Sequence, residues 1–277
     1  MKQTNRGAFP LAIFAAVLAA PFVWNLASTG AQQPAPPKYA MLEFMKIEPG
    51  KRDEYLKMER ELWMPIHRER LKAGMIKSWS LWSRRFPGGT SHEYDTICIT
   101  TFEKFTDVET SYPPEVFTRA HPKMTTVERN ARTVATRNMV RTEFVQLLDY
   151  TQLPASPGAS NTQPKYAYIG YMKHEPGKGY VNLEGKYWKP IHQERVNRGI
   201  LRSWALYQVR LPGGSNKEYS FFTIQLLDDF QHLENQYPAG IWEKVHPNVK
   251  QEEIDARTND ARKMVRTDLL TLVELVR

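Results

Sequence analysis

Two short stretches of the sequence repeat residue types that could form a binding or catalytic site. "WMPIHRER" begins at Trp63, and "WKPIHQER" begins at Trp188. A histidine can accept or donate a proton near neutral pH, an arginine can bind a carboxylate or a phosphate, and a tryptophan can pack against an aromatic ring. The recurrence of all three types at the same spacing predicts one such site, or a matched pair.

These words belong to a longer duplicated segment. When Lys38 is aligned with Lys165 and a two-residue deletion is allowed after "EPGK", roughly four positions in ten are identical over about 113 residues. The segments between the copies and before the first one are rich in Pro, Ser, Gly and Asn, which is typical of extended spacers. The predicted organisation is a signal segment 1–31, a Pro-rich spacer 32–37, a first repeat 38–150, a linker 151–164 and a second repeat 165–277.

The hydrophobic periodicity of each repeat predicts the order β-α-β-β-α-β. The first repeat is expected to contain strands at 39–49, 76–86, 92–102 and 139–150, a long helix at 50–75, and a largely helical region at 106–138 that breaks at His121-Pro122. This is the ferredoxin-like plan, in which helices cover only one face of the sheet. We therefore expect an α+β protein whose two ferredoxin-like repeats pack their uncovered faces together as an internal pseudo-dimeric barrel.

With this element order, the duplication and motifs such as "YAYIGYMKHEPGK" at residues 166–178, the chain resembles the dimeric α+β barrel superfamily. That superfamily includes antibiotic-biosynthesis monooxygenase-like and NIPSNAP-like proteins, and the resemblance covers both repeats. It implies the fold. For function it implies only a choice among oxygenases, haem-handling enzymes and proteins of unknown role, because the superfamily has no sharp catalytic signature.

The repeated face of the long helix predicts a cavity. Positions identical in the two copies fall within an arc of about 160° on a helical wheel, which we expect to face the sheet. Charged residues on a buried face need a partner or a ligand. Pro65 and Pro190 each remove a backbone hydrogen bond, free the carbonyls of Glu61 and Lys186, and should distort the helix beside the histidine. The candidate ligand-binding residues are Glu59, Trp63, His67, Arg70 and Tyr94, with Glu184, Trp188, His192, Arg195 and Tyr219 in the second repeat.

A purely structural role for these residues is the alternative. The strands offer Glu93/Glu218, Arg141/Arg266 and Glu143/Asp268 as members of internal ion-pair networks, while Trp79/Trp204 and Tyr94/Tyr219 are typical core aromatics. Arginines also recur near the end of the second helical region, where they could cap a helix or form a cationic mouth for a carboxylate or phosphate. The candidate anion-binding residues are Arg132, Arg137, Arg141, Arg257, Arg262 and Arg266.

The sequence offers little support for a cofactor. No spacing of Cys or His predicts a metal site, and no glycine-rich phosphate loop follows a strand. Haem stays open, with His67, His192, His121 or His246 as an axial ligand. The near-equality of the repeats argues against it, since a single haem site usually requires one half to specialise.

Composition points to export. Lys2 and Arg6 precede an apolar run at residues 8–26 and small residues that end at Ala31, the layout of a secretory signal. An uncleaved anchor is the alternative, and only then would the membrane be a partner. Cys98 is the single cysteine, so no intrachain disulfide can form. Without Lys2 and Arg6, 36 basic residues remain against 30 acidic ones, a net charge of +6; these charges are interspersed, which argues against nucleic acid as a partner.

Three hypotheses for function follow. The leading one is an exported, periplasmic or extracellular protein that binds a small anionic or aromatic molecule in one or two cavities between helix and sheet. The first alternative is an oxygenase, either cofactor-independent or haem-dependent, and the second is a non-catalytic interaction scaffold. Homo-oligomer formation stays open in all three.

Overall fold

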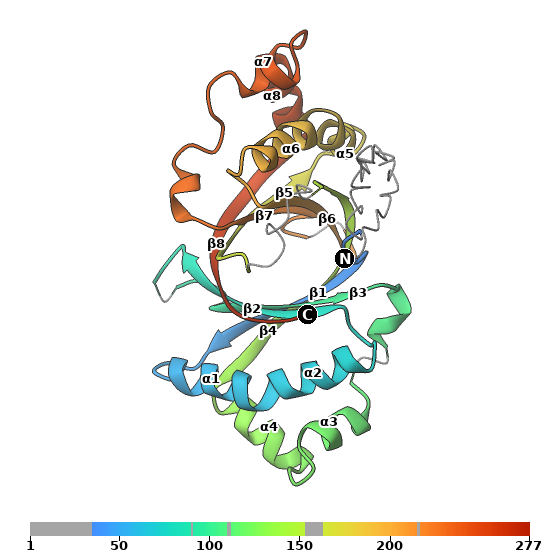
Figure 1. Cartoon of the computed structure of the whole chain (residues 1–277), viewed down its shortest axis with the longest axis vertical. Helices are drawn as coiled ribbons and strands as arrows, with labels where there is room; N and C mark the ends of the chain where they lie inside the picture. Colours follow the sequence, from blue (N-terminus) through green and yellow to red (C-terminus); the bar gives the residue numbers. More distant parts are fainter. Residues whose placement is uncertain (1–34, 90, 110–111, 153–162, 215–216) are drawn as a thin grey trace, which may run out of the picture. The chain divides into compact units, whose positions relative to one another are not determined.

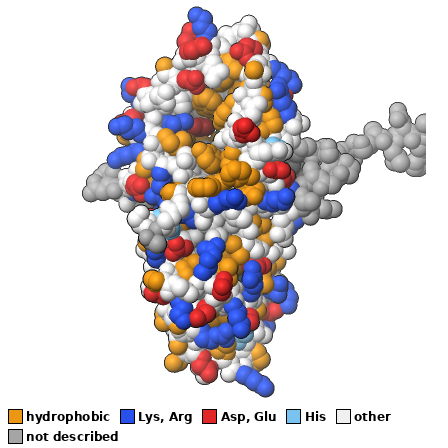
Figure 2. All heavy atoms as spheres, turned by 90° about the vertical axis from the view of Figure 1, so that its left-hand side faces the viewer, with side chains coloured by type: hydrophobic (Ala, Val, Ile, Leu, Met, Phe, Trp, Pro, Cys, Tyr) orange, Lys and Arg blue, Asp and Glu red, His pale blue; other side chains and the backbone are white. Residues whose placement is uncertain are grey.

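The computed structural model describes residues 35–89, 91–109, 112–152, 163–214 and 217–277, which belong to one compact unit. The predicted signal segment 1–31 lies outside the described residues, as does most of the linker at 151–164. Among the helices that are described, none is long and apolar enough to cross a lipid bilayer. On the face shown in Figure 2, basic and acidic side chains intermingle and neither sign dominates.

Both halves of the described chain contain the predicted order of elements. The first half contains β1 (Tyr39–Ile47), α1 (Arg52–Met58), α2 (Met64–Lys72), β2 (Ser78–Phe86), β3 (Thr96–Phe102), α3 (Pro114–Ala120), α4 (Thr126–Val134) and β4 (Arg137–Tyr150). The second half contains β5 (Tyr166–His174), α5 (Tyr180–Leu183), α6 (Lys189–Asn197), β6 (Ser203–Leu211), β7 (Phe221–Leu227), α7 (Ile241–Val245), α8 (Gln251–Ala261) and β8 (Arg262–Val276). Short 3-10 turns at Phe105–Val108 and Phe230–Leu233 follow β3 and β7.

The strands form a closed antiparallel barrel. Within the described residues its order is β1-β3-β2-β8-β5-β7-β6-β4. The halves therefore meet edge to edge, through the hydrogen-bonded pairs β2–β8 and β4–β6, and do not merely face each other as two separate sheets. β4 and β8 are 14 and 15 residues long, which lets each pair with a strand of its own half and with one of the other half. Helices α1–α4 lie on one side of the barrel and α5–α8 on the opposite side (Figure 1).

Successive side chains of β1 pack into two different hydrophobic cores. Ala40, Leu42 and Phe44 belong to the cluster that fills the barrel interior. Met41 and Met45 instead pack with the cluster beneath the helices, as expected when successive side chains point to opposite faces of a strand. A bulge between Phe44 and Met45 interrupts the pairing with β4. Outward-facing residues in the middle of β1 and β5 therefore lie under the helices.

The predicted distortion of the long helix is present in both halves. A π-helical turn at Glu59–Trp63 joins α1 to α2, and another at Glu184–Trp188 joins α5 to α6; each ends just before a residue pair containing the repeated proline. A wider turn of this kind adjusts which side chains face inward, and it is frequent at functional sites. Two residues after the last residue of α2 and of α6, the chain reaches a glycine with positive φ, 69° at Gly74 and 71° at Gly199, a conformation that favours glycine.

Candidate functional site

Each half contains a cavity between its distorted helix and its outer sheet surface. The first cavity has a volume of about 240 Å³ and the second of about 310 Å³. The linings of the two cavities correspond at nine aligned positions. At each position the residue of the first half lines the first cavity, and its counterpart in the second half lines the second. These pairs are Met45/Met172, Glu59/Glu184, Trp63/Trp188, His67/His192, Trp79/Trp204, Cys98/Thr223, Tyr112/Tyr237, Arg137/Arg262 and Met139/Met264.

A buried histidine forms part of the wall of each cavity. His67 stacks on Trp79 with 4.5 Å between ring centroids, and His192 stacks on Trp204 at 5.0 Å. Arg70 donates a hydrogen bond from Nη1 to Nδ1 of His67 over 2.9 Å. Because arginine has no acceptor, Nδ1 must be the unprotonated nitrogen and Nε2 carries the hydrogen. Arg195 makes the same 2.9 Å bond to His192.

Burial keeps both imidazoles neutral. Loss of solvation lowers the pKa of His67 well below its usual value, and the positive charge of Arg70 adds to the effect. The pKa of His192 is lowered for the same reasons, by burial first and by Arg195 second. Each cavity therefore contains a neutral imidazole that offers a hydrogen bond from Nε2.

The indole N–H groups beside the histidines have no protein acceptor. Nε1 of Trp79 and Nε1 of Trp204 are buried and make no hydrogen bond to any part of the chain that the structure describes. By contrast, Trp63 donates to the hydroxyl of Thr133 over 3.2 Å, and Trp188 donates to Thr258 over 3.0 Å. A buried donor without a partner costs about 1 to 3 kcal/mol. Each cavity wall therefore contains one buried indole donor whose hydrogen bond no described residue satisfies.

A carboxyl group on the π-helical turn completes each wall. Glu59 is 1 % exposed, and Nε of Arg137 lies 3.2 Å from its Oε1. Burial raises the pKa of Glu59 to about 7 despite this arginine. Burial likewise raises the pKa of Glu184 to about 7, against the opposing effect of Arg262. Both carboxyl groups can thus gain or lose a proton near neutral pH.

The predicted tyrosines do not belong to these cavities. Tyr94 and Tyr219 were candidate ligand-binding residues, but both lie in the cluster that fills the barrel interior. The hydroxyl of Tyr94 donates to Asp268 of the other half, and that of Tyr219 donates to Glu143 over 2.5 Å. The closed barrel brings these pairs together, so the tyrosines cross-link the halves and do not line a cavity.

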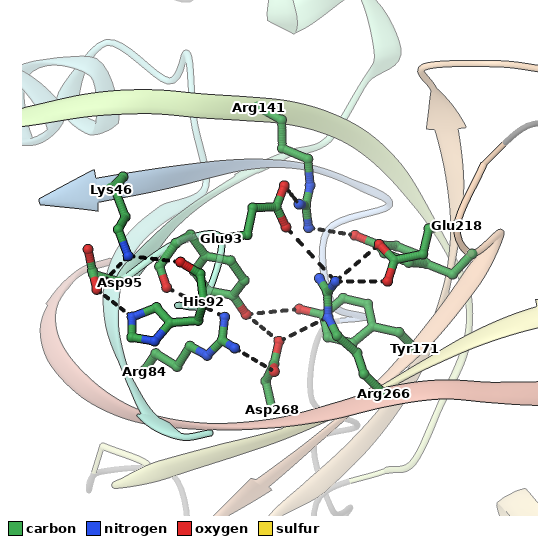
Figure 3. Close-up of polar contacts among 12 residues, drawn as sticks. Lys46, Arg84, His92, Glu93, Asp95, Arg141, Tyr171, Glu218, Arg266 and Asp268 are labelled. Carbon is green, nitrogen blue, oxygen red and sulfur yellow. Dashed lines mark hydrogen bonds and ion pairs between the residues drawn. The ribbon is translucent and has the colours of Figure 1, made fainter. Parts of the chain in front are cut away.

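The tyrosines are part of a larger polar group, here called the inter-half cluster, shown in part in Figure 3. Arg141 pairs with Glu93 and with Glu143 at 3.0 Å, and Arg266 pairs with Glu218 at 3.1 Å. Each arginine of the cluster meets at least one carboxylate. The inter-half cluster consists of Arg84, Glu93, Tyr94, Arg141, Glu143, Tyr171, Glu218, Tyr219, Arg266 and Asp268.

The six candidate anion-binding arginines do not converge on one mouth. Arg141 and Arg266 belong to the inter-half cluster, where carboxylates already pair with them. Arg132 lies 3.7 Å from Glu61 on the exposed surface, and Arg257 lies over the ring of Tyr187. The remaining two, Arg137 and Arg262, line the first and second cavity respectively. Of the six predicted anion-binding arginines, each cavity is therefore lined by one.

Arg70 and Arg195 lie behind the cavities. Both are fully buried, and each contacts an aromatic ring as well as its histidine. Within the described residues neither has a carboxylate partner, and the Nε and Nη2 atoms of both lack acceptors. They therefore orient the histidine and do not contact the cavity space directly.

Several residues that line the cavities do not belong to the predicted site. Tyr112 and Tyr237 line the two cavities, as do Met45 and Met172, and none of the four is among the predicted ligand-binding residues. Their identity in both copies was the available signal. Glu43 lines only the first cavity, and its counterpart in the second half is Gly170, so comparison of the repeats could not reveal it.

The cavities do not fit haem. A histidine ligates iron through an unprotonated nitrogen. In His67 and His192 the unprotonated nitrogen is Nδ1, which accepts a hydrogen bond from arginine, and Nε2 carries the hydrogen. His121 and His246 line neither cavity, and their Nε2 atoms donate to the carbonyls of Leu62 and Tyr187 over 2.8 and 2.9 Å. Among the described residues there is also no cluster of His, Cys, Asp and Glu that could hold a metal ion.

Comparisons with known proteins find similarity in structure alone. No protein-family model matches the sequence, and no curated protein matches it significantly. A provisionally named monooxygenase from Lactobacillus acidophilus is 9 % identical, with a TM-score of 0.52, over 87 % of this chain and 96 % of that one. Another from Fusobacterium nucleatum is 8 % identical, with a TM-score of 0.55, over 87 % and 94 %. An anthrone oxidase-like protein is 12 % identical, with a TM-score of 0.52, over 88 % and 94 %. At these identities the likeness concerns the fold, and the chain has the fold of the dimeric α+β barrel superfamily.

Proposed function

We propose that the protein binds a small, single-ring aromatic molecule in each of its two helix–sheet cavities. The observation that carries this proposal is the unpartnered indole N–H of Trp79, repeated at Trp204, next to a neutral histidine that also offers a hydrogen. Two donors that point to no protein acceptor favour a ligand oxygen. A phenol or an aromatic carboxylate has both the ring and the oxygen.

Size and lining support a ligand of one ring. Small-molecule sites usually have volumes of about 300 to 1,000 Å³. The first cavity, at about 240 Å³, is slightly smaller than this range, and the second, at about 310 Å³, lies at its lower end. Trp63, Trp79 and Tyr112 supply aromatic surface in the first cavity, and their counterparts do so in the second. Edge-to-face and offset contacts with such rings stabilise a bound aromatic molecule.

Calorimetric titration with phenol tests this proposal. The wild-type protein should bind two molecules per chain. Cys98→Leu should fill the first cavity and Thr223→Leu the second, because these aligned strand residues line the two walls, so each variant should bind one molecule. Circular dichroism confirms folding of the variants. Absence of phenol binding to the wild type, or a stoichiometry that neither substitution changes, would overturn the proposal and favour an interaction scaffold.

Oxidation of the bound molecule is a second candidate function. The specific observation is the carboxyl of Glu59, whose pKa of about 7 suits a group that takes the proton of a ring hydroxyl. The similar structures named as monooxygenase and anthrone oxidase-like lend this candidate its reaction class. Dioxygen uptake should then occur with a dihydroxybenzene, and the combined variant Glu59→Gln/Glu184→Gln should abolish most of it while phenol binding persists. Uptake that is equal in this variant and the wild type would refute a role for Glu59.

We further propose that the halves are two fused copies of one ferredoxin-like unit, 38–150 and 165–277, arranged as a pseudo-dimer. The shared element order and the nine aligned lining pairs support this. Residues 165–277 expressed alone should form a homodimer that rebuilds the β2–β8 type of strand pair; a stable monomer would contradict the proposal.

Export also stays a proposal. We expect the mature chain to begin near Gln32 and to reside in the periplasm or outside the cell. N-terminal sequencing of the protein from its native host checks this, and retention of residues 1–31 in a membrane fraction would indicate an anchored protein instead.

A further inference from the structure

The two cavities differ at one aligned strand position. Glu43 on β1 pairs with Cys98, and Gly170 on β5 pairs with Thr223, so the two residues occupy the same place in the two halves. The side chain of Glu43 points outward, beneath the helix, and lines the first cavity. At Gly170 the corresponding space is taken by Met264, whose Cε would lie 3.3 Å from an added Cβ.

Glu43 is a half-buried carboxylate without a partner among the described residues. Within the described residues it makes no hydrogen bond and no ion pair, because Arg137 is bonded to Glu59 instead. Burial raises the pKa of Glu43, and the charges of Arg137 and Arg70 oppose that rise. Its negative charge in turn is one of the causes that raise the pKa of Glu59. Two neighbouring carboxyl groups thus compete for one arginine on the same wall.

The lining residues of the second cavity carry no net charge, unlike those of the first. Only Glu184 and Arg262 are charged among its lining residues, whereas Glu43, Glu59 and Arg137 line the first. With all groups ionised, the lining charge is −1 in the first cavity and 0 in the second. The aligned histidines are neutral in both, and a fully buried arginine lies behind each.

Building on the proposed ligand sites, we propose that Glu43 makes the first cavity selective for an aromatic molecule that carries a protonated amine, while the second cavity lacks this selectivity. An ammonium group between Glu43 and Glu59 would satisfy the unpaired carboxylate and relieve the repulsion between the two. The indole N–H of Trp79, buried and without a partner among the described residues, supports a ligand in this cavity independently of Glu43. The second cavity holds no second carboxylate, so it offers an amine no such gain.

Benzylamine and the uncharged benzyl alcohol are matched probes for this difference. Indole N–H resonances report each cavity separately, with Trp79 and Trp204 assigned from their Trp→Phe variants. Benzylamine should shift the Trp79 resonance at a concentration at least tenfold lower than the one that shifts Trp204, whereas benzyl alcohol should shift both within about threefold of each other. Calorimetry of the wild type in buffers of different ionisation enthalpy should also show proton release when benzylamine binds.

Glu43→Gln keeps the shape and removes the charge. Since Glu43 bonds to no described residue, the variant should fold normally; it should lose the preference for benzylamine and keep its affinity for benzyl alcohol. Glu103→Gln, an exposed change of the same charge, should behave as the wild type. If benzyl alcohol shifts both indoles but benzylamine shows no preference, or if Glu43→Gln retains one, this inference fails while the proposed sites stand. If no probe shifts either indole, the proposed function fails as well.

Discussion

The inter-half cluster and the helix–sheet cavities contain similar residues in opposite states. In the cluster, every arginine meets a carboxylate of its own or the other half, as Arg141 meets Glu143 at 3.0 Å. Behind the cavities, Arg70 and Arg195 meet only neutral groups, and the neighbouring indoles have no acceptor among the described residues. The ion pairs give the inter-half cluster a structural role. The cavities, whose walls contain indole donors without an acceptor, are the candidates for ligand binding.

The largest expected effect is on the cluster. Asp268 is 1 % exposed, accepts from Tyr94 and pairs with Arg266. Asp268→Ala should lower the free energy of unfolding by about 3 to 5 kcal/mol, because the buried Arg84 loses the carboxylate with which it pairs, although Arg266 keeps Glu218. Chemical denaturation measures the loss, and phenol titration of the folded fraction should show unchanged affinity. A variant as stable as the wild type would mean that the cluster does not hold the halves together.

The raised pKa of the cavity carboxyl should be seen in the pH dependence of the free energy of unfolding. The pKa of Glu59 rises from 4.5 in the unfolded chain to about 7 in the folded one. Between these values the folded state binds more protons, so this carboxyl makes the protein less stable as pH rises from about 4.5 to 7. Glu59→Gln removes that effect and should gain up to about 3 kcal/mol relative to the wild type over this range. Denaturation curves at several pH values check it; parallel stability profiles would exclude the raised pKa.

The smallest effect separates binding from stability most cleanly. Trp79→Phe removes the unpartnered N–H and retains a ring against His67. Phenol affinity at the first cavity should fall about tenfold, the equivalent of about 1.4 kcal/mol of binding free energy. The free energy of unfolding should change by less than this amount. Trp204→Phe should do the same at the second cavity. Equal phenol affinity in wild type and variant would show that the indole N–H contacts no ligand.

Local pattern and duplication together predicted much of the structure. Alternation along residues 39–49 predicted β1, and the repeated Pro65 and Pro190 predicted a distorted helix beside the histidines, which the π-helical turns confirm. Positions that are identical in both copies pointed to the helix face on which Trp63 and His67 line a cavity. These features depend on residues that are close together in the sequence, so local patterns are enough to predict them.

Long-range pairing was beyond the reach of such patterns. That Tyr94 would bond to Asp268, 174 residues away, depends on closure of the barrel through β2 and β8. Arg141 and Arg266, by contrast, pair with carboxylates of their own halves, Glu143 and Glu218, as the alternative of internal ion-pair networks predicted. Glu43 was not predicted for a different reason: a position that differs between the copies is not found when only their identities are compared.

Diffraction from crystals soaked in 4-bromophenol tests the central claim most directly, because anomalous scattering locates bromine without reference to any assumed site. We expect one bromine in each helix–sheet cavity, with the phenol oxygen near the indole nitrogen of Trp79 or Trp204, and none in the inter-half cluster. Crystals that diffract well but hold no bromine in either cavity, or hold it in the cluster instead, would contradict the assignment of these cavities as ligand sites.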